Sequence, residues 1–119
     1  MNILVIDDEK DIRDLVSRTL TGAGYNVTSA GTVPEAEQLI IKKKWDLVIS
    51  DVMIPHLGGF EIADLVKAKK DTPVILLTGM DKEILNSTLT EANAILIKPV
   101  SAQKLLDTVR ETLSLQEPA

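Results

Sequence analysis

The chain has 119 residues, 45% of them hydrophobic, and a formal net charge of −5 at pH 7. That length predicts one folded domain over residues 1–119 with a single hydrophobic core. The absence of cysteine excludes a disulfide framework and a thiolate metal site, and the negative charge is against nonspecific binding of nucleic acid by this domain.

Neither a leader nor a membrane span is expected. The first residues, MNILVIDDEK, have no basic segment before their short apolar run, which is unlike a signal peptide. No apolar run approaches the roughly 18–20 residues that cross a bilayer. We therefore expect a cytoplasmic protein without membrane contact.

Five short segments have the composition of β-strands: Ile3–Ile6, Tyr25–Ser29, Asp46–Ser50, Val74–Leu77 and Ala94–Ile97. Four of them contain consecutive aliphatic residues, which is typical of a strand that is covered on both faces. This pattern favours the interior of a parallel sheet.

Segments of helical period follow the strands. Apolar faces at helical spacing begin, in chain order, at Ile12, Val33, Phe60, Ile84 and Leu105. Gly22 and Gly24 predict the end of the first helix, and Thr32 with Glu35 can form a capping box at the start of the second. The fifth helix is expected to begin near Ser101.

Strands that alternate with helices predict a (βα)5 domain of the α/β class. The crossover connections imply a parallel sheet, and right-handed crossovers place helices on both of its faces. Residues 115–119 are expected to be a tail or the start of a linker, because they follow the fifth helix and include Pro118.

Reactive side chains follow four of the five predicted strands. Asp7 and Asp8 follow the first, Asp51 the third, Thr78 the fourth and Lys98 the fifth. In open parallel sheets, sites form beyond the carboxyl ends of the strands. We therefore expect these side chains to share one site.

Three neighbouring carboxylates repel one another unless one is protonated or a cation joins them. Oxygen ligands without His or Cys favour a hard ion, so Mg²⁺ is expected before Zn²⁺. Lys98 and Thr78 can hold the oxygens of a phosphoryl group, and a carboxylate can serve as its acceptor. The pattern indicates phosphoryl transfer.

The segments VIDDE, VISDVMIP, ILLTG and ILIKPV, in this order, resemble the motifs of response regulator receiver domains over the whole chain. The resemblance implies a doubly wound, flavodoxin-like sheet of order 2-1-3-4-5 and a cis bond between Lys98 and Pro99. It implies a phosphoprotein of a two-component system that signals by changing conformation, rather than an enzyme. Its expected partners are a sensor histidine kinase or a histidine phosphotransfer protein, and an output domain or downstream protein.

The resemblance also assigns roles. Asp51 would be the phosphoacceptor that attacks a phosphohistidine, Thr78 would donate a hydrogen bond to a phosphoryl oxygen, and Lys98 would pair with the phosphoryl group. Four groups would hold Mg²⁺, namely the carboxylates of Asp7, Asp8 and Asp51 and the backbone carbonyl of Met53.

One position departs from this family. Receiver domains commonly carry Tyr or Phe three residues before the lysine, and its rotation reports phosphorylation. Here the residue is Ile95. We therefore expect the phosphoryl chemistry to be retained and the readout of the signal to be unusual.

Two other functions remain as alternatives. One is a pseudo-receiver that docks partners without being phosphorylated. The other is a flavodoxin-like module that binds a cofactor, but Asp7, Asp8 and Glu9 would repel the cofactor's phosphate unless a metal intervened. A third function, a phosphatase of the haloacid dehalogenase type, is disfavoured, because such an enzyme would have an acid–base Asp at the position of Met53.

Overall fold

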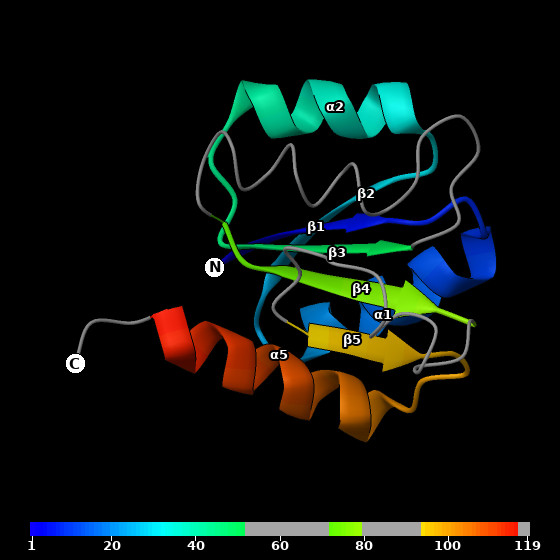
Figure 1. Ribbon diagram of the computed structural model, residues 1–119, viewed down its shortest axis with the longest axis vertical. Helices are drawn as coiled ribbons and strands as arrows, with labels where there is room; N and C mark the ends of the chain where they lie inside the picture. Colours follow the sequence, from blue (N-terminus) through cyan, green and yellow to red (C-terminus); the bar gives the residue numbers. More distant parts are fainter. Residues whose placement is uncertain (52–71, 80–93, 117–119) are drawn as a thin grey trace, which may run out of the picture.

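The computed structural model describes residues 1–51, 72–79 and 94–116 (Figure 1). Its strands are β1 (Asn2–Ile6), β2 (Asn26–Ala30), β3 (Leu47–Asp51), β4 (Val74–Thr78) and β5 (Ala94–Ile97). The helices of this part of the chain are α1 (Lys10–Gly22), α2 (Val33–Lys42) and α5 (Ala102–Gln116). The third and fourth predicted helices and Met53 lie outside the described residues.

The five strands form one parallel sheet of order β2-β1-β3-β4-β5. This confirms the predicted parallel sheet and the strand order that the family resemblance implies. Because all strands run in one direction, their carboxyl ends lie along one edge, to which the arrows in Figure 1 point. Every side chain that follows a strand is therefore brought to that edge.

Helices cover both faces of the sheet, as predicted. Helices α1 and α5 pack on one face and α2 lies over the other (Figure 1). Alternate strand residues such as Ile3 and Val5 join the buried cluster that includes Val16 of α1 and Val109 of α5. Leu4 is equally buried but points to the opposite face. Burial on both faces explains the consecutive aliphatic residues of the strands.

The ends of α1 and α2 follow the sequence signals with one difference. The N–H of Gly24, whose φ is 98°, donates to the carbonyl of Thr21 beyond the end of α1. Thr32 Oγ1 accepts from the N–H of Glu35 at 3.3 Å, as in a capping box. In a capping box the Glu35 carboxylate would accept from the N–H of Thr32. Here it accepts instead from the N–H of Gly31, one residue earlier, at 2.9 Å.

None of the helices within residues 1–51 and 94–116 is long and apolar enough to cross a membrane.

Candidate functional site

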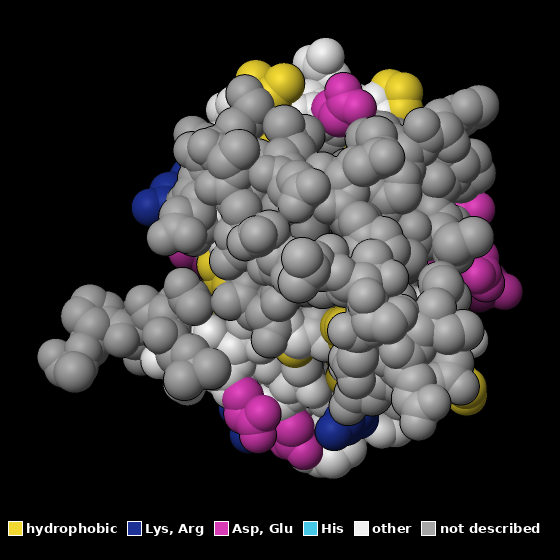
Figure 2. Space-filling model, viewed as in Figure 1, with side chains coloured by type: hydrophobic (Ala, Val, Ile, Leu, Met, Phe, Trp, Pro, Cys, Tyr) yellow, Lys and Arg dark blue, Asp and Glu magenta, His cyan; other side chains and the backbone are white. Residues whose placement is uncertain are grey.

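Four strand ends deliver the predicted site residues to one edge of the sheet. Asp7 follows β1, Asp51 and Thr78 are the last residues of β3 and β4, and Lys98 follows β5. The register keeps these positions close to one another: Asp7 and Asp51 directly follow the pair Ile6–Ser50. Thr78 directly follows Leu77, the partner of Asp51, and Lys98 directly follows Ile97, the partner of Thr78. In Figure 2, acidic side chains are visible at the right, on the side towards which the strands point.

Asp7 is fully buried. Its Oδ1 accepts a hydrogen bond from the backbone N–H of Glu9 at 2.9 Å. Its Oδ2 lies 3.0 Å from Lys98 Nζ, an ion pair, yet this oxygen accepts no hydrogen bond of good geometry among the described groups. The ion pair offsets part of the cost of burying this oxygen, and a second cation would offset more of it.

Lys98 is the centre of the site. Besides Asp7, its Nζ lies 3.2 Å from Asp51 Oδ2 and 3.4 Å from Glu9 Oε1. Its backbone N–H donates to the carbonyl of Thr78 at 2.7 Å, which fixes the chain where it leaves β5, and the Lys98–Pro99 bond is cis, as predicted. One ammonium group thus joins carboxylates from two strand ends.

Burial and nearby charges shift the pKa of two groups in the site. Burial raises the pKa of Asp7, and so does the nearby charge of Asp51, against the opposing effects of the Glu9 N–H and of Lys98. Burial lowers the pKa of Lys98, but its close contacts and charge interactions with Asp7 and Asp51 outweigh burial, so the net effect is to raise the pKa. The site therefore holds a firmly charged cation beside a carboxylate that is costly to ionise.

The carboxylates fit a divalent cation. Asp7, Asp8, Glu9 and Asp51 each offer an oxygen, and these oxygens all lie within 4.8 Å of one another. Asp8 and Glu9 are exposed, whereas Asp7 and Asp51 are buried, so a bound ion would face protein on one side and water on the other. Oxygen ligands that leave room for water suit Mg²⁺.

The structure brings together Asp7, Asp8, Asp51 and Lys98, as predicted, and buries Thr78 at the same edge. Glu9 was not among the predicted ligands, although it directly follows the Asp pair. Glu9 contacts Lys98, which is 89 positions away in the sequence, and no local sequence pattern indicates such a contact.

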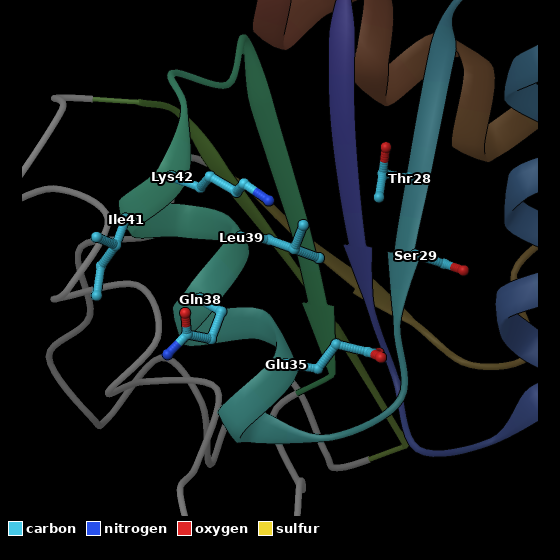
Figure 3. A pocket seen from close by; sticks show the side chains of 7 residues that line it. All are labelled: Thr28, Ser29, Glu35, Gln38, Leu39, Ile41 and Lys42. Carbon is cyan, nitrogen blue, oxygen red and sulfur yellow. The ribbon is translucent and has the colours of Figure 1, made fainter.

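A separate groove lies away from this edge, between β2 and α2 (Figure 3). Thr28 and Ser29 line it from the strand, and Glu35, Leu39 and Lys42 line it from the helix. None of the residues of the acidic site borders it.

Comparison with known proteins identifies relatives over nearly the whole chain. Residues 3–110 match the family model of the response regulator receiver domain. The probable transcriptional regulator ycf27 of Cyanidium caldarium is 34% identical over 106 residues, which are 87% of this chain and 43% of that protein. The chain thus spans less than half the length of this curated relative.

Solved structures agree in fold. The chemotaxis protein CheY4 of Vibrio cholerae is 34% identical, with a TM-score of 0.84 over 93% of this chain and 97% of that one. TrrA of Thermotoga maritima, solved in complex with Mg²⁺-BeF, is 32% identical with the same TM-score and coverage. A receiver domain protein of Methanospirillum hungatei is 28% identical, with a TM-score of 0.88 over 97% of this chain and 94% of that one.

Proposed function

The chain belongs to the response regulator receiver domains of two-component signalling, and from this membership we propose that it accepts a phosphoryl group on Asp51 with Mg²⁺ as cofactor. The observation that carries the proposal is the meeting of Asp51 with Asp7 and Lys98 at one edge of the sheet. The two carboxylates and the ammonium group in contact there would supply a nucleophile, metal ligands and a cation. The proposed phosphoryl donors are a histidine kinase or a phosphotransfer protein.

In the proposed transfer, an Asp51 carboxylate oxygen attacks the phosphorus of a phosphohistidine. The new bond joins this oxygen to phosphorus, and the phosphorus–nitrogen bond breaks with its electron pair returning to the imidazole. Strand β3 holds Asp51 at its end, where it is 5% exposed, so the carboxylate has a fixed direction before the donor arrives.

The other residues would handle charge. Asp7, Asp8 and Asp51 would hold Mg²⁺, together with the backbone carbonyl of Met53 that the family resemblance implies. When bound, the ion would neutralise part of the charge that builds on the phosphoryl oxygens. Lys98, now paired with Asp51, would turn to a phosphoryl oxygen, and Thr78 would donate a hydrogen bond to another.

We propose that the protein is a switch rather than a turnover enzyme, and that it passes the signal to an output domain or a downstream protein. The alternatives are less well supported. A pseudo-receiver has no need of the Lys98 contacts to two buried carboxylates, and the acidic cluster disfavours a phosphate-bearing cofactor.

Acetyl phosphate, a small phosphoryl donor, tests the proposal. With Mg²⁺ we expect the full chain to gain the mass of one phosphoryl group, and hydroxylamine to remove it, as it does from acyl phosphates. In EDTA the reaction should slow by about tenfold or more, because the carboxylates would then repel the donor. An equal rate in EDTA, or no adduct with Mg²⁺, would contradict the proposal.

Ile95 makes the readout unusual. It lies in β5, half-buried, beside a surface groove that Ile97, Pro99 and Lys104 also line. An aliphatic side chain has no ring to rotate and no hydroxyl to bury. We expect beryllofluoride with Mg²⁺ to shift the NMR amide signals of β5 less in the natural chain than in Ile95→Tyr. Equal shifts in both proteins would show that position 95 does not set the readout.

A further inference from the structure

Arg13 of α1 contacts the backbone at the end of β1. Its Nη1 donates to the carbonyl oxygen of Asp7 at 2.7 Å, and the bond is partly buried. Asp7 lies one residue past the last registered pairs of β1, in which Ile6 is opposite Ala30 and Ser50. The guanidinium therefore binds the first carbonyl beyond the paired residues of β1.

Because Gly31 has no side chain, the guanidinium of Arg13 can lie against its backbone. A Cβ at this position would lie 2.8 Å from Arg13 Nη1 and 3.1 Å from its Cζ, which is closer than van der Waals contact. Gly31 is itself held from the other side, since its N–H donates to Glu35 Oε1, and Figure 3 shows Glu35 extending from α2 towards the strands. The backbone after β2 is thus fixed, and Arg13 lies against it.

These contacts complete the support of Asp7. Its N–H donates to the carbonyl of Ala30 at 3.2 Å, its carbonyl accepts from Arg13, and its carboxylate accepts from Glu9 N–H. With both backbone groups fixed, the peptide between Asp7 and Asp8 has a set orientation. The directions in which the two carboxylates leave the chain depend on that orientation.

We infer that Arg13 is a positioning residue for the cation site, and that Gly31 leaves room for its guanidinium, which a side chain at position 31 would displace. The inference rests on the proposed function, in which Asp7 and Asp8 hold Mg²⁺. The planar guanidinium can donate to a carbonyl while its face lies on Gly31, which an ammonium group cannot do. Groups that orient metal ligands typically change metal affinity about 10- to 100-fold when they are lost.

Titration of the full chain with Mg²⁺ by calorimetry tests this. We expect the dissociation constant to rise about tenfold in Arg13→Met and about threefold in Gly31→Ala. Removing a cation near a metal site would by itself strengthen Mg²⁺ binding, so a charge effect and a positioning effect have opposite signs. Arg18→Met, an exposed position on the same helix, is the matched control and should stay within twofold of the natural chain.

The double variant and unfolding in EDTA separate positioning from general stability. Gly31→Ala should add nothing in the Arg13→Met background, because its methyl group acts by displacing the guanidinium. Urea unfolding should remain cooperative, and Arg13→Lys, which keeps a donor, should fall between Arg13→Met and the natural chain. If Arg13→Met does not fold, Gly31→Ala and Arg13→Lys provide the same comparison.

The outcomes separate the two proposals. If the natural chain binds Mg²⁺ and Arg13→Met binds it within twofold or more tightly, the role of Arg13 is overturned while the proposed function stands. The role of Arg13 would also be overturned if Gly31→Ala raised the Mg²⁺ dissociation constant of Arg13→Met by the same factor as that of the natural chain. If the natural chain itself binds no Mg²⁺, the proposed cofactor is overturned, and the role of Arg13 with it.

Discussion

Replacing Asp51 by Asn is expected to lower phosphoryl incorporation from acetyl phosphate by at least about a thousandfold, because a carboxamide is not a nucleophile. Asn has nearly the same shape as Asp, so the end of β3 should keep its geometry. Loss of the reaction would then be due to chemistry rather than to unfolding. The measurement is intact-protein mass spectrometry over time with Mg²⁺, with a circular dichroism melt to confirm the fold.

Asp46→Asn is the matched control for this experiment. Asp46 directly precedes β3, at the opposite end from Asp51, and its exposed carboxylate accepts a hydrogen bond from the N–H of Asn2. This variant should be phosphorylated at the rate of the natural chain. A phosphoryl group that still forms on Asp51→Asn would place the acceptor elsewhere, with Asp7 and Asp8 the first positions to examine by peptide mapping.

Most of the fold follows from local patterns, because strands buried on both faces have few polar residues. The errors at the strand ends have physical causes. Tyr25 was predicted to begin a strand, but its N–H donates to the carbonyl of Leu20 and so belongs to the end of α1. Asp51 and Thr78 were predicted to follow their strands, yet both are paired in register, with Leu77 and Ile97.

The strand order was harder to predict than the parallel sheet. Alternating strands and helices imply crossover connections, but several orders satisfy them, and order 2-1-3-4-5 came from the family resemblance rather than from the spacing. The fold itself then explains the site. Once β1 lies between β2 and β3, the chain after β2 is next to Asp7, and Asp51 is on its other side.

The residues that sequence reasoning missed act over long distances or through the backbone. Glu9 was visible in the acidic run, but its contact with Lys98 depends on the packing of β5. Arg13 lies between Ile12 and Asp14 in α1, and nothing in this sequence distinguishes it from a solvated arginine. Its hydrogen bond is to a backbone carbonyl oxygen. Because every residue has this group, the sequence does not indicate which carbonyl an arginine will bind.

Lys98→Met is expected to destabilise the metal-free protein by about 3 kcal/mol at pH 7.5, since it leaves buried carboxylates without their cation. In the natural chain, Lys98 Nζ is within 3.2 Å of both Asp7 Oδ2 and Asp51 Oδ2, and its side chain is only 15% exposed. Methionine preserves much of the length and removes the charge. The measurement is urea unfolding in EDTA.

Lys10→Met gives a comparison for an exposed ion pair. Lys10 Nζ lies 3.1 Å from Asp14 Oδ2, but the lysine side chain is 78% exposed. Water and salt screen such a pair, so its removal should change the free energy of unfolding by less than about 0.5 kcal/mol. A similar loss in both variants would mean that burial does not govern the contribution of Lys98.

The stability deficit of Lys98→Met should depend on pH with a definite sign. Burial already raises the pKa of Asp7, and Lys98 opposes that rise, so losing the lysine raises this pKa further. A carboxyl group with a raised pKa binds its proton more tightly in the folded state, and stability then falls as the pH rises above the unfolded value of about 3.9. The deficit should therefore be small near pH 4 and complete by pH 7.5.

Mg²⁺ should reduce the same deficit at pH 7.5, because a bound cation replaces part of the missing charge and stabilises the folded state by mass action. Unfolding curves at pH 4 and 7.5, each with Mg²⁺ and with EDTA, would show both effects in one protein. A deficit that is equal at both pH values and unchanged by Mg²⁺ would assign the role of Lys98 to packing of its methylene chain. The pH and Mg²⁺ dependence together thus distinguish a charge that balances Asp7 and Asp51 from a side chain that only fills space.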